Sequence, residues 1–490
     1  MYILYVLLLI ICGLILKWIS DRRTFFARMS AYPEAKNTLP FLGNILENLT
    51  PTDIIPNLLK YRKECGKSFK LILGPFATYV MTTDANFIEF ILTSPKLIEK
   101  SWDYEFMRNW LGNGLISAPG NIWAKHRKLI TPAFHFKILE KMVEQLNSNS
   151  SILIKKLSNH VDTEIDIYPF VTLSTLDIIC ETSMGISFNA QEDNNSKFVV
   201  ATRQILQIIE NRIYSAIKQS NLLYKFTLDY WREKSVVKYL HKITNNIISE
   251  RREEFKNKAE TNPDVDDIGI KKRNFFLDLL LEFGLSNDEI RDEVNTVMFA
   301  GHDTTASAIS FTLYLLSNNL DVQNKLYEEI ASILGSDIEP TYNQFQEMKY
   351  LKNVIKESLR LYPPVMMFAR DVYEDVYYND KLIPKGARVG VFVYGLHRES
   401  EHYKNPESFI PERFELKEEN RRSAFSFVPF SAGQRNCIGQ RFAMLSMKSA
   451  ICKIVRNFEI LPVSHKKPLI SYEVILKSSN GIYIKLRKRS

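Results

Sequence analysis

The chain has 490 residues, 45% of them hydrophobic, and a formal net charge of +8. This apolar fraction is ample for a large core, and the mild positive charge, without concentrated basic runs, argues against a nucleic-acid binder. The five scattered cysteines form no C-x-x-C pair, which excludes a disulfide framework or zinc site and favours a reducing compartment. The charge suits an anionic membrane surface or an acidic partner protein.

The N-terminus predicts a membrane anchor. Residues 1–16 are uncharged and apolar, and the run continues past Lys17 to Ile19, roughly 28 Å of helix. The cations follow this segment and no small-residue cleavage site does, so we expect an uncleaved anchor in the endoplasmic reticulum membrane with the rest of the protein on its cytosolic face. We divide the chain into an anchor (1–19), a basic, proline-containing connector (20–40) and a single large domain (41–490).

Two short β-like runs, 69–73 and 78–82, flank Gly74-Pro75 and predict a hairpin. The segment 109–136 then contains W-x-x-x-R at Trp123 and Arg127, which on a helix places an indole N–H and a guanidinium on one face, able to bind one anion. The alternative is an arginine that extends past a core tryptophan to solvent, which is common. Amphipathic helices are expected over 138–250, with a polar turn at 189–197, and a solvated loop over the highly charged 251–273.

A long helix is predicted from the capping box Ser286-Asn287-Asp288-Glu289 to about Asn318. Its middle reads Ala300-Gly301-His302-Asp303-Thr304-Thr305, in which a mid-helix glycine is unfavourable and threonine can bond back to the preceding turn. A close helix crossing would account for Ala300 and Gly301 alone. An acid and a hydroxyl beside a loosened turn are poorly explained by packing and indicate proton-transfer chemistry.

Helical periodicity returns at 351–359 and ends before Pro363-Pro364. Glu357 and Arg360 lie at i,i+3, which on an exposed helix would contribute only about 0.2–0.5 kcal/mol. Pro411-Glu412-Arg413-Phe414 follows later in the chain and supplies a further arginine.

The stretch 430–439, F-S-A-G-Q-R-N-C-I-G, carries the chain's most specific signal. Gly433 permits a tight turn, Gly439 lets the backbone approach a flat group, and the next residues form a helix, so Cys437 lies at a helix N-terminus that favours the thiolate. Arg435 can bind a carboxylate in bidentate fashion. A lone cysteine in such a junction is usually structural, but here Phe430, Gly433, Arg435, Cys437 and Gly439 coincide.

These motifs, in this order, resemble those of the cytochrome P450 superfamily, and 109–136 and 293–305 resemble its family-four branch of microsomal fatty-acid ω-hydroxylases. The resemblance implies a mainly α fold with small β-sheets, forming a single large haem-binding domain behind the anchor. It implies Cys437 as the proximal ligand of haem b. It makes Trp123, Arg127 and Arg370 partners of the haem propionates, and it assigns Phe430, Gly433, Arg435 and Gly439 to the haem-binding loop.

The same resemblance implies that Thr304 holds the distal oxygen and its water and that Asp303 delivers protons. It brings Arg413 to Glu357 and Arg360 as a cluster that fixes the haem loop, and it places 365–368 along the substrate pocket. One departure matters: many family-four members carry, immediately before the glycine, a glutamate that becomes ester-linked to the haem, whereas this chain has Ala300. We therefore expect a haem that is not covalently bound, and the inference of strict terminal-carbon selectivity is weakened.

The function expected from the resemblance is hydroxylation of lipophilic substrates, fatty acids or related lipids, with electrons from NADPH through a flavoprotein reductase and with cytochrome b5 as a second candidate donor. Alternatives are xenobiotic detoxification by the same chemistry, a reductase-independent haem-thiolate isomerase or dehydratase, and a non-catalytic haem binder. No nucleic-acid partner is expected. Lys125, Lys128, Arg441 and Lys448 could form a docking face for an acidic reductase or simply a solvated face.

Overall fold

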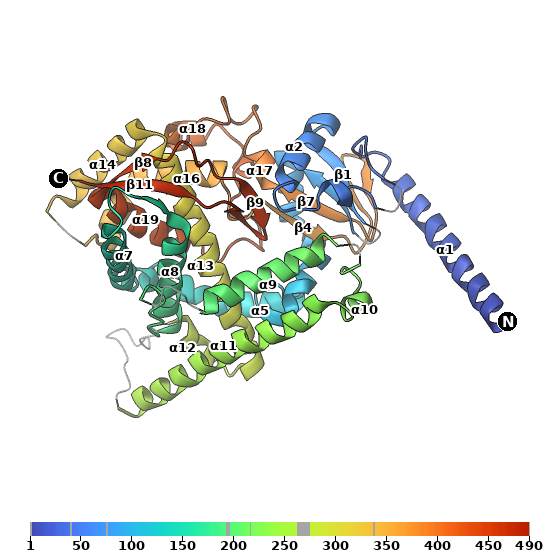
Figure 1. Ribbon diagram of the computed structural model, residues 1–490, viewed down its shortest axis with the longest axis horizontal. Coiled ribbons are helices and arrows are strands. Elements are labelled where there is room, and N and C mark those ends of the chain that lie inside the picture. Colours follow the sequence, from blue (N-terminus) through green and yellow to red (C-terminus); the bar gives the residue numbers. More distant parts are fainter. Residues whose placement is uncertain are drawn as a thin grey trace.

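The computed structural model describes residues 2–39, 42–74, 77–192, 197–215, 217–261, 275–336 and 339–489. Helix α1 (Tyr2–Arg28) projects from the remainder of the molecule as a separate rod, with the chain's two ends on opposite sides (Figure 1). None of its residues is buried, and it is the one helix of the described ranges that is long and apolar enough to cross a membrane. The helix runs nine residues beyond the expected anchor, and the expected boundary at 40–41 lies outside the described residues.

Helix α13 (Asn287–Ser317) runs through the middle of the molecule (Figure 1). The predicted capping box is confirmed: the Glu289 N–H donates to Ser286 Oγ at 3.2 Å, and the Ser286 N–H donates to Glu289 Oε2 at 2.9 Å. Around α13 pack α8 (Ile167–Ile179), α11 (Leu228–Thr261), α16 (Lys349–Leu361) and α19 (Gln440–Asn457). Most of α13 is therefore buried, because helices cover several of its faces.

The remaining helices pack on this group, on the sheets or at the surface. They are α2 (Ile54–Cys65), α3 (Ala85–Thr93), α4 (Arg108–Leu111), α5 (Gly120–Ile130), α6 (Phe136–Lys141), α7 (Val143–Ser158), α9 (Lys197–Ile213), α10 (Asn221–Tyr224), α12 (Phe276–Glu282), α14 (Leu320–Leu334), α15 (Tyr342–Glu347), α17 (Val393–Leu396) and α18 (Leu416–Glu419). The loop predicted from residue 251 is wrong for its first part, because α11 continues to Thr261. The remainder of that segment, 262–273, lies outside the described residues, as do 193–196 of the polar turn.

The largest sheet has the strand order β1-β2-β7-β4. Strands β1 (Ser68–Leu73) and β2 (Ala77–Thr82) pair antiparallel, as predicted. Strand β7 (Arg388–Phe392) then pairs parallel to β2, and β4 (Met367–Asp371) pairs antiparallel to β7. Three smaller sheets are formed by β3 (Glu164–Asp166), β11 (Tyr483–Lys488) and β8 (Phe458–Pro462); by β9 (Ile470–Glu473) and β10 (Ile475–Ser478); and by β5 (Val376–Tyr378) and β6 (Lys381–Ile383).

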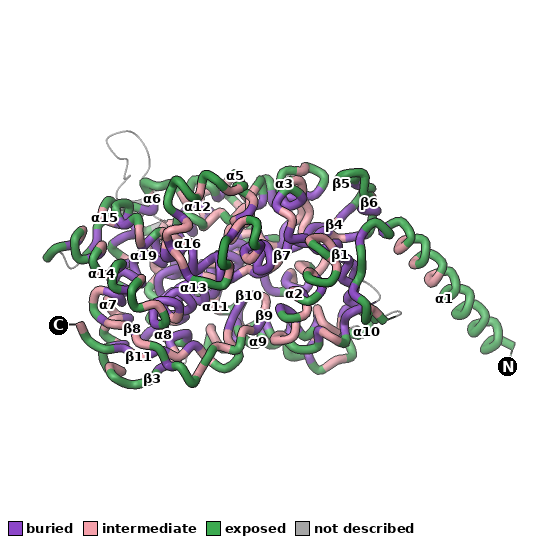
Figure 2. The backbone as a smooth tube through the Cα atoms, turned by 90° about the horizontal axis from the view of Figure 1, so that it is seen from above, coloured by how far each residue is buried: buried purple, intermediate pink, exposed green. Residues whose placement is uncertain are grey.

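The apolar side chains gather in two clusters. The larger surrounds α13, and the smaller joins α3 to strands β4 and β7. Buried segments accordingly run through the interior, whereas the outer loops and α1 are exposed (Figure 2). The architecture is mainly α with small sheets, as expected from the sequence.

Candidate active site

A cavity of about 370 Å³ separates the middle of α13 from the cysteine-bearing loop. Its lining includes Ala300, Gly301 and Thr304 from α13, and Cys437 and Gly439 from the loop. Seven of the ten residues predicted for the site line it: Trp123, Arg127, Thr304, Phe430, Arg435, Cys437 and Gly439. Asp303, Arg370 and Gly433 are not part of the lining. The fold therefore brings a predicted metal ligand and a predicted proton-transfer hydroxyl to one enclosed space.

Hydrogen bonding and glycine conformation set the shape of the loop. The Cys437 N–H donates to Phe430 O at 2.9 Å, closing the turn on itself. Gly433 has φ +68, and a Cβ there would overlap Leu92 O, so a side chain is excluded by both strain and space. At Gly439 a Cβ would meet nothing nearer than Phe134 Cε1 at 3.8 Å. The space beside Gly439 thus belongs to the cavity and suits a flat group.

Cys437 faces the cavity from a position two residues before Gly439, the N-cap of α19. Its side chain is accessible from the cavity that it lines. The protein packed around the cavity nevertheless desolvates the sulfur, which raises the pKa of the thiol and outweighs the Gly439 N–H and the cations Arg127 and Lys100, which act in the opposite direction. The helix N-terminus, which was expected to favour the thiolate, is therefore insufficient by itself to lower the pKa of Cys437. A sulfur with this environment is stabilised as thiolate by a metal cation bound to it, which fits an iron ligand.

A group of buried cations lies beside the loop. The Arg435 guanidinium stacks 4.5 Å over the Trp123 ring and donates from Nη2 to Ala118 O at 3.0 Å, but its Nε and Nη1 have no hydrogen-bond partner in the described structure. Arg370, 2% exposed, likewise leaves Nη1 without one. Burial and then Arg370 lower the pKa of Arg435 to about 10, and burial followed by Arg370 and Arg435 lowers that of Lys100. Glu99 Oε2, 3.8 Å from Arg435 Nη2, supplies one negative charge to this group. The N–H groups that stay without a partner in the described structure can bind further anions, such as the two carboxylates of a haem.

Arg127 ties α5 to the same loop. Its Nη1 donates to Asn436 O at 2.9 Å, and its Nη2 donates to Asn436 Oδ1 at 2.7 Å. Trp123, one turn earlier, lines the cavity with it, so the two side chains share a face of the helix as the W-x-x-x-R spacing requires.

The α13 residues divide between the cavity and the helix behind it. Thr304 lines the cavity and donates from Oγ1 to Ala300 O at 2.8 Å, which leaves its oxygen free to accept a hydrogen bond from water. A Cβ on Gly301 would lie 2.6 Å from Ile179 Cδ1, so the close crossing with α8 explains this glycine. Asp303 points elsewhere: its Oδ1 accepts from the Tyr168 hydroxyl at 2.9 Å, and its Oδ2 lies 3.1 Å from Lys477 Nζ.

Asp303 is 3% exposed and held as a carboxylate. Burial by itself raises its pKa, but Lys477, His302 and Tyr168 together keep the pKa below the ordinary aspartate value. A carboxylate that is ion-paired in this way must separate from Lys477 before it can transfer a proton toward the cavity.

The sequence reasoning missed several polar residues near the cavity. His126 of α5 and Glu293 of α13 form a buried pair, Nδ1 to Oε1 at 2.7 Å, and Glu293 Oε2 accepts from the Leu115 N–H at 3.2 Å. This pair joins the helix that carries Trp123 to α13. Glu210 of α9 also lines the cavity. The sequence pattern that could have identified it is an acidic residue at helical spacing within an otherwise apolar helix face.

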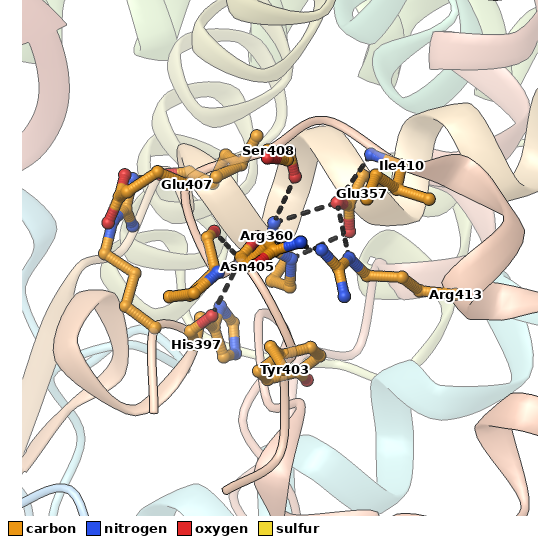
Figure 3. A network of polar contacts seen from close by, with 12 residues as sticks. Glu357, Arg360, His397, Tyr403, Asn405, Glu407, Ser408, Ile410 and Arg413 are labelled. Atoms are coloured by element: carbon orange, nitrogen blue, oxygen red, sulfur yellow. Dashed lines mark hydrogen bonds and ion pairs between the residues drawn. The ribbon is translucent and has the colours of Figure 1, made fainter. Parts of the chain in front are cut away.

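The predicted cluster of Glu357, Arg360 and Arg413 is confirmed (Figure 3). Arg360 Nε lies 2.7 Å from Glu357 Oε2, both side chains being fully buried, and Arg413 Nε lies 3.3 Å from Glu357 Oε1. Arg360 also donates to three main-chain carbonyls, those of His397 at 2.9 Å, Pro406 at 2.6 Å and Ser408 at 3.0 Å.

This cluster reaches the cysteine loop through His397. The His397 Nε2 accepts from the Val428 N–H at 3.0 Å, two residues before Phe430. Burial, followed by the charge of Arg360, lowers the pKa of His397 to about 3, so its ring stays neutral and keeps an acceptor nitrogen. Three charges, of which those of Glu357 and Arg360 are fully buried, thus fix the segment that leads into the loop.

Three of the four residues named for a basic docking or solvated face lie at the surface. Lys125, Lys128 and Arg441 are exposed. Lys448 is 6% exposed and donates from Nζ to the carbonyls of Phe345 and Met348, so it belongs to the interior.

Comparison with known proteins gives concordant results. The family model described as Cytochrome P450 matches residues 33–486. Cytochrome P450 4d2 of Drosophila melanogaster is 41% identical over 469 residues, covering 92% of this chain and 93% of that protein. Human cytochrome P450 4V2 is 38% identical over 481 residues, covering 94% of this chain and 91% of that protein.

Proposed function

The chain belongs to the cytochrome P450 family, a family of haem-thiolate monooxygenases, and from this premise we propose that it hydroxylates lipophilic substrates with electrons from NADPH delivered by a flavoprotein reductase. The observation that carries the proposal is the cavity with Cys437 on one wall and Thr304 on another. Fatty acids or related lipids are the substrates that the resemblance to family four favours.

In this proposal Cys437 ligates the haem iron through its sulfur, and Phe430 and Gly439 leave room for the ring beside the loop. Arg435, Arg127, Arg370 and Trp123 bind the propionates, supported by the unused N–H groups of Arg435 and Arg370. Gly433 keeps the turn that presents the sulfur. When bound, the thiolate-ligated haem supplies reductive activation of dioxygen and insertion of one oxygen atom into the substrate.

Thr304 and Asp303 are proposed to manage protons. The Thr304 hydroxyl donates to Ala300 O, so its oxygen is oriented to accept from a water in the cavity and hold it in place. Asp303 is proposed to pass protons from the protein interior to the cavity. It would have to separate from Lys477 before this transfer can take place. The apolar remainder of the lining excludes other water and positions the substrate.

Thr304→Ala is expected to uncouple the enzyme. Without the hydroxyl the water is no longer held, and loss of positioned proton transfer typically costs about 10²-fold or more in rate. NADPH would still be consumed, but peroxide would rise and product per NADPH would fall. Thr305→Ala is the control, since Thr305 also lines the cavity and leaves its Oγ1 unbonded in the described structure. If Thr305→Ala uncouples the enzyme while Thr304→Ala keeps its normal product per NADPH, the water-holding role belongs to Thr305 and not to Thr304.

We expect the haem to be extractable into acidified organic solvent, because Ala300 offers no carboxylate for an ester link. Ala300→Glu restores the family's glutamate and provides the matched comparison: part of its haem should stay with the protein after extraction. Haem that remains with the unmodified chain under these conditions contradicts the prediction. The measurement is haem absorbance in the solvent and in the protein fraction.

Helix α1 is proposed as a single anchor in the endoplasmic reticulum membrane, with the catalytic domain on the cytosolic face. There the exposed Lys125, Lys128 and Arg441 provide a basic surface for an acidic reductase or for cytochrome b5.

Co-expression with a reductase, followed by a screen of fatty acids, terpenoids and model xenobiotics for hydroxylated products, tests the whole proposal. NADPH-dependent products support a monooxygenase. Turnover of lipid peroxides without NADPH or reductase would instead indicate the isomerase or dehydratase alternative. Products confined to xenobiotics would assign the chain to detoxification.

A further inference from the structure

Two polar side chains on the cavity wall, one in α9 and one directly after it, each have an oxygen without a hydrogen-bond partner in the described structure. Glu210 and Tyr214 line the cavity beside Ile209 and Ile213. Glu210 is 5% exposed, and its Oε1 makes no hydrogen bond within the described structure; the same holds for the Tyr214 hydroxyl. Buried polar groups are nearly always hydrogen-bonded in folded proteins, so these two are candidates to bind a ligand.

The titratable groups around Glu210 and Tyr214 come from four parts of the chain. β9 contributes Tyr472 and Glu473, β10 contributes Lys477, β2 contributes Tyr79, and Asp103 acts on both Tyr214 and Tyr472. Burial and then Glu473 raise the pKa of Glu210 to about 8, against the smaller opposite effect of Lys477, whose ammonium lies 3.1 Å from Asp303. Glu210 is therefore an uncharged carboxylic acid at neutral pH, with an O–H to donate.

The cations that line the cavity, Lys100, Arg127 and Arg435, are not among the charges that act on Glu210. Lys100 and Arg127 act electrostatically on Cys437, and Lys100 also acts on Arg435 beside the loop. These cations are the proposed partners of the loop and of the haem carboxylates. The charges that act on Glu210 are instead Glu473 and Lys477.

The same surroundings that keep Glu210 protonated disfavour any other negative charge placed beside it. A fatty acid that binds there as the neutral acid, so that no second charge is buried beside Glu473, has to take up a proton first; for a carboxyl with an ordinary pKa of about 4.3 this weakens its apparent binding at neutral pH by on the order of 10²- to 10³-fold. An uncharged oxygen carries no such penalty. It can accept hydrogen bonds from both the Glu210 and the Tyr214 hydroxyl groups.

We propose that Glu210 and Tyr214 bind the uncharged oxygen of a neutral lipid, such as an ester, ketone or alcohol, and discriminate against the carboxylate of a free fatty acid. This inference rests on the proposed function and narrows its substrate class. The hydrocarbon body of the lipid lies along the apolar lining, which includes Val297, Val365 and Phe368.

The test is a binding titration of the purified holoprotein, followed by the change in its haem absorbance, with laurate, methyl laurate and lauryl alcohol. At neutral pH the ester and the alcohol are expected to bind about 10²-fold more tightly than laurate. Tyr214→Phe removes one hydroxyl and should weaken ester binding about tenfold. Equal affinity for laurate and methyl laurate overturns the inference.

A pH series separates recognition from a purely structural role. Ester binding by the unmodified protein should weaken as pH rises through about 8, because ionised Glu210 no longer donates, whereas alcohol binding persists because the alcohol donates to the carboxylate. Glu210→Gln keeps a donor at every pH and should give a flat ester profile. Glu473→Gln should move the midpoint to lower pH, since it removes a charge that opposes ionisation.

Identical ester profiles for the unmodified protein and Glu210→Gln would overturn the inference while leaving the proposed function intact. The haem content and carbon monoxide spectrum of each sample distinguish a failure of the proposed function from a failure of the lipid-binding inference. If the unmodified protein binds no haem, the proposed function fails, and this inference fails with it.

Discussion

Replacing Cys437 by serine is expected to abolish monooxygenase turnover and the carbon monoxide absorbance diagnostic of thiolate ligation. A serine hydroxyl is smaller than the thiol but has the same shape, and the loop is held by the Cys437 N–H to Phe430 O and by Arg127 on Asn436, neither of which uses the sulfur. The variant should therefore fold. What it lacks is a soft, anionic ligand for iron, which a hydroxyl with its much higher pKa cannot replace.

The measurement is the difference spectrum of the reduced protein under carbon monoxide, with product formation and the unfolding midpoint recorded on the same sample. Cys65→Ser provides the matched control, because Cys65 is a half-buried cysteine outside the cavity lining. A Cys437→Ser protein with an unchanged spectrum and unchanged turnover would refute the assignment of the ligand.

Glu357→Gln is expected to produce a protein that is unstable and poor in haem. Removing this carboxylate charge leaves Arg360, fully buried, and Arg413 without their shared counter-charge. Loss of one partner from a buried ion pair typically destabilises a protein by about 3–5 kcal/mol. Because Arg360 and His397 connect the cluster to Val428, the loop that presents Cys437 should lose its position as well.

Glu407→Gln is the control within the same region (Figure 3). Glu407 lies 3.1 Å from Arg398 with its side chain 72% exposed, and exposed ion pairs contribute only about 0–1 kcal/mol. The readouts are haem bound per protein and the free energy of unfolding in denaturant. The structural role is wrong if Glu357→Gln matches Glu407→Gln in both, or if it loses activity while keeping full stability and haem content.

Several features were predictable because their signals are local. A capping box requires only Ser286 and Glu289 to be three residues apart, and both of its hydrogen bonds form. The hairpin of β1 and β2 was predictable for the same reason. The positive φ of Gly433 agrees with the tight turn that the loop motif predicts at this glycine.

Other features depend on partners that are distant in the sequence. Asp303 stands beside Thr304 in the chain, yet it turns to Lys477 and Tyr168, because adjacent helix residues point in different directions and α8 and β10 occupy that side. The position of Lys448 after an apolar stripe predicts a cation at the surface. Its ammonium is instead bound by main-chain carbonyls in the interior.

The amino-acid sequence by itself determined the family, the cysteine loop and the long capped helix, because each depends on residues a few positions apart or on a fixed motif. The contact of Arg413 with Glu357 was expected only from the family resemblance. Only the tertiary structure decided the electrostatics. Desolvation outweighs the helix end at Cys437, Arg435 and Arg370 keep N–H groups without a hydrogen-bond partner in the described structure, and burial with Glu473 raises the pKa of Glu210 in the cavity wall. The physical reason is that a pKa is set by desolvation and by neighbouring charges, and both arise only when separate segments pack together.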